Sequence, residues 1–172
     1  MIRIAIRGLV DGSLSSLGVV IGAAISENVT IILSAGLSGA VANGLSNILA
    51  AFTAEKIGRY KALKITEKHM IKSLKGTTLE KIVARDVLKG GFIDGTVSIV
   101  GGLIPIIPFF FLTITSGVYV SIGLVTLLAA ILGAYTGYVS SENIIFSVVK
   151  MMIFTLATAG ICALLMLLLE TA

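Results

Sequence analysis

Two aspartates interrupt long apolar stretches of this 172-residue chain, and their carboxylates could bind a cation. Asp11 and Asp94 each lie about one to two helical turns inside an apolar stretch, roughly 5–10 Å deep at 1.5 Å per residue. A carboxylate at that depth in lipid is costly, so such residues usually face a bundle interior or a water-filled path and bind ions or protons. The alternative interpretation is that each Asp caps a helix start at the level of the lipid headgroups. The sequence leaves both interpretations open.

The two aspartates stand in matching segments. Residues 8–15 read GLVDGSLS and residues 91–98 read GFIDGTVS, so every position is identical or conservatively replaced. The match predicts a parallel duplication of a two-helix hairpin, with helices one and two repeated as three and four, followed by a fifth helix. Internal repeats are common in transporters, and binding sites often form where the repeats meet.

Small residues accompany Asp11 along the first apolar stretch at intervals of three or four, which places them on one side of a helix. They are Gly8, Gly12, Ser15, Gly18 and Gly22. Small residues at such intervals let two helices approach closely. The pattern predicts a face that packs closely against another helix. If that helix belongs to a second copy, the homodimer seam would enclose Asp11 and an ion path.

Five apolar stretches must position these residues, and each is long enough to span about 30 Å of hydrocarbon. They cover residues 4–25, 30–53, 91–113, 118–139 and 146–169. Hydrophobic residues make up 56% of the chain, charged residues 13%, and the mean hydropathy is +1.07. A soluble domain would carry about a quarter of charged residues. The predicted fold is therefore a single all-α membrane domain with five transmembrane helices.

The distribution of charge predicts the orientation in the membrane. All thirteen Lys and Arg lie in three places: at Arg3 and Arg7, between residues 56 and 89, and at Lys150. Basic residues concentrate in cytoplasmic loops, so the N-terminus and residues 55–90 are predicted to be cytoplasmic and the C-terminus outside. With no targeting peptide evident, the expected location of this multi-pass chain is a prokaryotic plasma membrane. Acidic residues among the basic ones, with few aromatics, argue against nucleic-acid binding.

Residues 55–90 are predicted to form two short amphipathic helices. Gly76 is a plausible stop, and Thr77 with Glu80 forms a capping-box pattern that opens the second helix. The main interpretation is a hairpin that lies against anionic lipid headgroups, and the alternative is a metal-binding or partner-binding role. The weak candidates for cytoplasmic metal ligands are Glu67, His69, Met70 and Glu80.

The chain resembles the vacuolar iron transporter family in three segments. They are Val10-Asp11-Gly12 followed by GVVIGA at residues 18–23, AGLSGAVANGLS at residues 35–46, and GLIPIIP at residues 102–108. The resemblance implies a five-helix homodimer in which metal leaves the cytosol along the dimer interface in exchange for protons, with Asp11 on the path. It implies a transported divalent ion, Fe²⁺ or Mn²⁺, and no prosthetic group.

The chain departs from the family at expected metal ligands. Where the family has a Met and a Glu in its second helix, this chain has Asn47 and Ala51, and a short Lys-rich segment stands in place of the family's Glu-rich cytoplasmic domain. An all-oxygen site would suit hard cations such as Mn²⁺, Mg²⁺ or Ca²⁺, with Fe²⁺ also possible. The predicted substitute site consists of Asp11, Asp94, Asn43, Asn47 and Glu55.

Together these features predict a divalent metal transporter, proton-coupled and exporting, that contacts membrane lipid and forms a homodimer. The alternative is a non-transporting membrane scaffold or partner-binding protein of the same fold that acts through its basic segment. An enzyme is not expected. Paired acids of an intramembrane aspartyl protease are the nearest catalytic set, and the sole histidine, His69, is far from the membrane spans.

Overall fold

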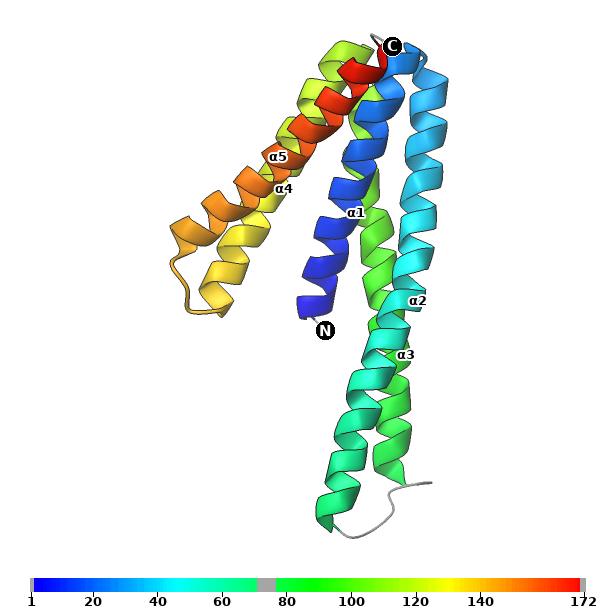
Figure 1. Cartoon of the computed structure of the whole chain (residues 1–172), viewed down its shortest axis with the longest axis vertical. Coiled ribbons are helices and arrows are strands. Elements are labelled where there is room, and N and C mark those ends of the chain that lie inside the picture. The colour runs from blue at the N-terminus through cyan, green and yellow to red at the C-terminus, as the bar shows by residue number, and fades with distance from the viewer. Residues whose placement is uncertain (1, 71–76, 171–172) are drawn as a thin grey trace.

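The computed structural model describes residues 2–70 and 77–170, and every regular element in these ranges is helical (Figure 1). The elements are α1 (Ile2–Ala23), η1 (Ala24–Ser26), α2 (Val29–Met70), α3 (Thr78–Leu103), η2 (Ile107–Phe110), α4 (Ile114–Val139) and α5 (Ile144–Glu170). Within the described residues, four helices are long and apolar enough to cross a membrane: α1 with η1, α2, α4 and α5. The predicted all-α membrane fold is confirmed, and the helices that correspond to the first, fourth and fifth predicted spans have nearly the predicted bounds.

The third predicted span, residues 91–113, is not one continuous helix. α3 ends at Leu103, and the chain continues through a turn and the short 3-10 helix η2. Pro105 and Pro108 explain the break, because proline lacks a backbone N–H and its ring clashes with the preceding turn. The carbonyl of Pro105 accepts a 2.6 Å hydrogen bond from Ser121 Oγ on α4. The apolar half of α3 is therefore too short to count among the four membrane-crossing helices.

The described parts of the basic segment are helical, as predicted, but its two helices are not short and separate, because each is continuous with a longer helix. α2 continues past residue 53 to Met70 and has 42 residues, about 63 Å at 1.5 Å per residue. α3 begins at Thr78, with Thr77 as the predicted N-cap residue, and continues into the membrane half without interruption. The segment between Phe52 and Met70 is rich in Ala, Lys, Arg and Glu, which favour helix, so α2 has no reason to end. Gly76, the predicted stop, lies outside the described residues.

As a result, α2 and α3 extend as a hairpin beyond the N-terminal end of α1 (Figure 1). The basic segment therefore follows the axes of these two helices. The interpretation that this hairpin lies against lipid headgroups stays a prediction.

Helices α1, α2 and α3 pack closely because glycines face the backbones of neighbouring helices. A Cβ at Gly12 would collide with the carbonyl of Ser98 on α3, and one at Gly95 would collide with the carbonyl of Gly44 on α2. Close approach of this kind is typical of small residues in membrane helices. The packing brings the polar residues of α1, α2 and α3 within hydrogen-bonding distance of one another.

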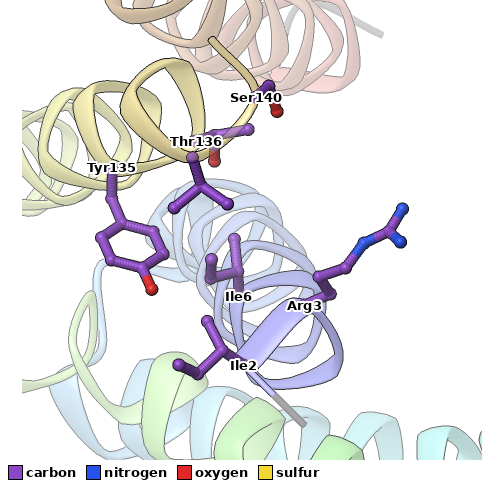
Figure 2. A pocket seen from close by; sticks show the side chains of 7 residues that line it. Ile2, Arg3, Ile6, Tyr135, Thr136 and Ser140 are labelled. Carbon is purple, nitrogen blue, oxygen red and sulfur yellow. The ribbon is translucent and has the colours of Figure 1, made fainter.

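Helices α4 and α5 form a hairpin that diverges from α1 toward the N-terminal end of α1 (Figure 1). At that end a cavity of about 430 Å³ separates α1 from α4 (Figure 2). At the opposite end, Leu17 and Ile21 of α1 form a buried cluster with Val125 of α4 and Ala159 of α5. The hairpin is thus packed against α1 at one end and separated from it at the other.

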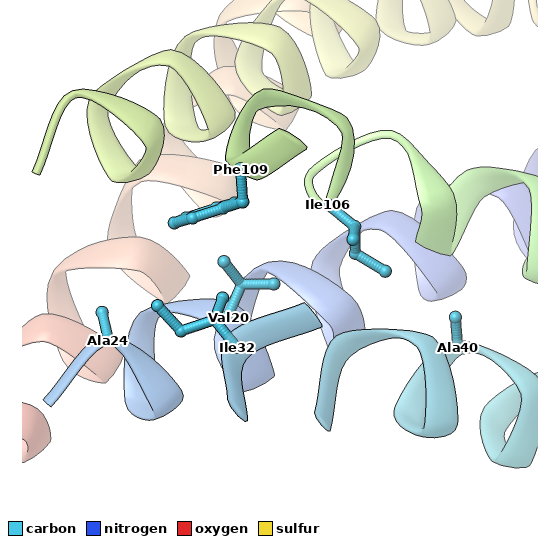
Figure 3. Close-up of a cluster of buried hydrophobic side chains, with 6 residues drawn as sticks. All are labelled: Val20, Ala24, Ile32, Ala40, Ile106 and Phe109. Carbon is cyan, nitrogen blue, oxygen red and sulfur yellow. The ribbon is translucent and has the colours of Figure 1, made fainter. Parts of the chain in front are cut away.

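A second buried cluster closes the same end of the molecule by joining α1, α2 and the segment after α3 (Figure 3). It consists of Val20, Ala24, Ile32, Ala40, Ile106 and Phe109. The two clusters place the hydrophobic core at the C-terminal end of α1, so the polar residues near the N-terminal end lie outside it.

Candidate functional site

Asp11 is at the centre of a hydrogen-bonded cluster of polar side chains from three helices. The amide nitrogens of Asn43 and Asn47 on α2 donate to Asp11 Oδ2 at 2.9 and 2.7 Å. Each of these nitrogens also donates to Oγ of Ser98 on α3, at 3.0 Å. Ser98 is fully buried, so its hydroxyl anchors both amides from inside the bundle. The structure thus brings three of the predicted site residues together.

Ser98 belongs to this cluster, although the sequence patterns did not single it out as a site residue. A signal was present, because Ser98 is the last residue of the repeated segment 91–98 and stands four positions after Asp94. Residues four apart on a helix share a face. The same rule places Asn43 and Asn47 together on α2 and explains why both reach one carboxylate.

The orientation of the two amides decides what the cluster can bind in this state. The nitrogens of Asn43 and Asn47, not their oxygens, contact Asp11. The predicted amide oxygen ligands could therefore reach a cation at Asp11 only after each amide rotates by half a turn. Within the described residues, Asp11 Oδ1 accepts no hydrogen bond, so one carboxylate oxygen is available to a cation.

Asp94 forms an ion pair with Arg7, which the sequence patterns did not predict. Arg7 Nη2 lies 2.8 Å from Asp94 Oδ2, and Arg7 Nε lies 3.3 Å from Asp94 Oδ1. Asp94 is 3% exposed, and a buried carboxylate without a counter-ion is strongly unfavourable. The guanidinium therefore compensates the charge that Asp94 would otherwise offer to a metal.

Asp11 and Asp94 nevertheless lie in the wall of one cavity of about 260 Å³, together with Arg7 and Asn47. The sequence left open whether the two acids meet within one chain, and here both border the same cavity of one chain. The three ionisable groups of this wall carry a net charge of −1 when Asp11, Asp94 and Arg7 are all ionised. The second predicted ligand is thus near the first but already paired.

Glu55, the predicted substitute ligand on α2, lies in a different ionic group. Arg59 Nε donates to Glu55 Oε2 at 2.7 Å, and Arg59 Nη1 donates to Asp86 Oδ2 on α3 at 3.1 Å. Arg59 thereby links the extended parts of α2 and α3. The contacts favour a structural role for Glu55 in this state.

The predicted cytoplasmic ligands do not converge in the part of the chain that the structure describes. His69 is exposed, and its Nδ1 lies 2.8 Å from the carbonyl of Ile65. Glu67 and Glu80 both have interaction partners, and the side chain of Met70 lies outside the described residues. No group of three or more His, Cys, Asp or Glu that could hold a metal occurs among the described residues.

The predicted small-residue face of α1 divides between two environments. Gly8 and Gly12 are buried, and their α-carbons face the backbone of Asp94 and Ser98 on α3 of the same chain. Gly18 faces the sulfur of Cys162 on α5. Gly8 and Gly12 are therefore not available to a second copy. Asp11, Ser15 and Gly22 are exposed, and they form the remaining open face.

The cluster thus presents a carboxylate on an exposed face of α1, one of the four described helices that are long and apolar enough to cross a membrane. A charge that faces hydrocarbon is costly, so intramembrane acids normally face protein or water. A second protein surface or a hydrated path must therefore cover Asp11 in the membrane.

Comparison with known proteins assigns the chain to a family. The sequence profile of the VIT family matches residues 59–166, from the extended part of α2 into α5. An uncharacterized protein of Methanocaldococcus jannaschii is 44% identical over 163 residues, which cover 93% of this chain and 85% of that protein. The family consists of membrane metal transporters, not enzymes. The chain therefore belongs to the VIT family, the vacuolar iron transporters that its sequence resembles.

Proposed function

We propose that this protein exports a divalent metal cation, Fe²⁺ or Mn²⁺, from the cytosol in exchange for protons, along a path that passes Asp11. The observation that carries the proposal is the exposed carboxylate of Asp11 at membrane depth, held by two amides and with one oxygen open. Family membership supports the general activity, a membrane metal transporter. The family match begins at residue 59, so the role of Asp11 rests on its geometry.

A homodimer would solve the problem of the exposed charge. Two copies that meet through the open face of Asp11, Ser15 and Gly22 would cover both carboxylates and bring them to one seam. Two ionised Asp11 side chains supply two negative charges, which match one divalent cation. In a single copy, the cavity wall formed by Asp11, Asp94 and Arg7 has a net charge of −1. Two copies therefore match the charge of a divalent cation better than one copy does.

The proposed coordination uses oxygen ligands. Rotation of the Asn43 and Asn47 amides would add their oxygens to the open carboxylate oxygen of Asp11. Carboxylate and amide oxygens suit Mn²⁺ and related hard cations, and they accept Fe²⁺. The same carboxylate would hold a proton when no metal is bound, which couples the two fluxes. Asp94 stays with Arg7 and shapes the cavity.

The proposed orientation follows the basic residues. The N-terminus and the α2–α3 extension would lie in the cytoplasm of a prokaryotic cell and the C-terminus outside, because basic residues are retained on the cytoplasmic side. Metal would then reach Asp11 from the N-terminal end of α1.

Uptake of Mn²⁺, Fe²⁺ and Co²⁺ into liposomes that contain a metal-quenched dye tests the proposal. Wild type should transport, and Asp11→Asn should lose uptake while it keeps its elution volume and helix content. Glu142→Gln is the control, because Glu142 is an exposed acid in the turn between α4 and α5. Imposed pH gradients of either sign should drive or oppose uptake.

Each outcome has a distinct meaning. Loss of uptake in Asp11→Asn with retention in Asp94→Asn is expected from the Arg7 ion pair. Normal uptake by Asp11→Asn would refute the assigned path. Well-folded wild type that moves no divalent cation would refute transport and favour the scaffold alternative.

A further inference from the structure

The diverging α4–α5 hairpin leaves a cleft beside α1. Two cavities of about 430 and 270 Å³ lie between α1 and this hairpin, and a third of about 300 Å³ lies where α1 meets α4 and Val97 of α3. Besides Ile2, the residues of α1 that line the 430 and 270 Å³ cavities recur every three or four positions: Arg3, Ile6, Val10 and Leu14. They form one stripe of the helix. This stripe continues into the packed cluster at Leu17, so the cleft is the unfilled part of a single helix–hairpin interface.

The lining of the cleft is apolar along its length and basic at its mouth. Ile2, Ile6 and Leu132 are typical of the walls. At the mouth, Arg3 and Ser140 lie toward one side of the cavity and the ring of Tyr135 toward the other (Figure 2). None of the residues that line the three cavities is acidic.

Lys150 adds a second cation to the cleft. It lines the 270 Å³ cavity, about a turn and a half into α5. A lysine at this depth extends its four-carbon stem so that the amine reaches the interface. Within the described residues, neither Arg3 nor Lys150 forms an ion pair. Two cations without acidic partners thus border an apolar cleft that opens into the hydrocarbon.

We propose that one anionic glycerophospholipid occupies this cleft, in the leaflet at the N-terminal end of α1. Its phosphate binds the guanidinium of Arg3 and accepts a hydrogen bond from the Ser140 hydroxyl. One acyl chain follows Ile6 and Leu132 between α1 and α4. Basic pockets between membrane helices bind anionic headgroups by this combination of charge and apolar contact. The lipid fills the interface where the protein does not pack against itself.

Brominated lipids and a single introduced tryptophan test the site, because the chain contains no Trp. Tyr135→Trp places a probe in the cleft. Tyr138→Trp is the matched control, since Tyr138 lies one turn further along α4 and is 75% exposed. The full-length variants are reconstituted in phosphatidylcholine that contains increasing fractions of brominated phosphatidylglycerol or brominated phosphatidylcholine, and Trp fluorescence is measured. If Tyr135→Trp does not fold, Val139→Trp in the same cavity replaces it.

Brominated phosphatidylglycerol should quench the Tyr135→Trp probe at a lower mole fraction than brominated phosphatidylcholine. The mole fraction for half-maximal quenching should fall by about fivefold for each basic residue that binds the headgroup. Tyr138→Trp should show little preference between the two lipids. Addition of Arg3→Gln should reduce the preference at Tyr135→Trp by about fivefold, whereas Arg85→Gln, on the α2–α3 extension, should leave it unchanged.

Two results would overturn the site. Equal quenching by both lipids at Tyr135→Trp would mean ordinary contact with bulk hydrocarbon. Quenching of Tyr138→Trp without quenching of Tyr135→Trp would mean that protein, such as a second copy, fills the cleft.

Discussion

Removal of the Arg7 guanidinium should destabilise the fold, because it leaves the carboxylate of Asp94 without a counter-ion. Asp94 is 3% exposed, and two guanidinium nitrogens lie 2.8 and 3.3 Å from its oxygens. Loss of one partner of a buried ion pair costs about 3–5 kcal/mol. The Arg7 side chain is 57% exposed, and water weakens the interaction at that end, so we expect on the order of 2–3 kcal/mol for Arg7→Gln.

A double-mutant cycle separates this charge effect from lost packing. Asp94→Asn leaves Arg7 in contact with water and should cost about 1 kcal/mol. The double variant Arg7→Gln, Asp94→Asn replaces the ion pair by two neutral groups and should also cost about 1 kcal/mol, which gives a coupling energy of roughly 2–3 kcal/mol. Unfolding in mixed micelles by SDS titration, followed by circular dichroism, measures each free energy.

The control for this cycle is Arg3→Gln, one turn earlier on α1. Among the described residues Arg3 forms no ion pair, so its replacement should change the free energy of unfolding, extrapolated to zero SDS, by less than about 0.5 kcal/mol. A double variant that is no more stable than Arg7→Gln alone would refute the reasoning, because the loss could not then come from an uncompensated Asp94 charge.

Two further perturbations test the packing. Gly12→Ala would place a methyl group against the carbonyl of Ser98 and should cost about 1–3 kcal/mol or more, whereas Gly123→Ala, on an exposed part of α4, meets no described atom within 4 Å. Size-exclusion profiles should show aggregation of the first variant and monodisperse protein for the second, and equal profiles would contradict the close α1–α3 contact. Ser121→Ala removes the donor to the Pro105 carbonyl and should lower the free energy of unfolding by about 1–3 kcal/mol. An unchanged SDS titration would mean that this carbonyl finds another donor.

Much of the candidate site could be predicted from residue type and spacing. Asp11 was recognisable because a carboxylate inside an apolar stretch needs a partner or a path. Asn43 and Asn47 were predicted as amide-oxygen ligands because Asn47 stands where the resembled family has a Met ligand. The contact between these residues agrees with that reasoning, but the direction of the amides does not follow from it. Rotation about the terminal side-chain bond depends on the groups that surround each amide.

Helix ends were harder to predict than helix identity. The length of an apolar run predicts where a chain enters lipid, not where a helix stops. α2 continues to Met70 because its polar part also favours helix, and α3 ends at Leu103 because Pro105 interrupts an apolar run. In both cases the helix preference of the local residues, and not the boundary between lipid and water, decided where the helix ends.

The sequence by itself determined that this is an all-α membrane protein, that its basic residues cluster on a few segments, and that Asp11 stands out chemically. These are properties of composition and periodicity, which are local. Tertiary structure alone decided that Arg7 pairs with Asp94, that Ser98 joins the Asp11 cluster, and that Gly8 faces α3. The physical reason is that contacts between helices depend on how each helix is rotated and tilted against its neighbours. Many distant side chains set those angles together, and no single segment specifies them.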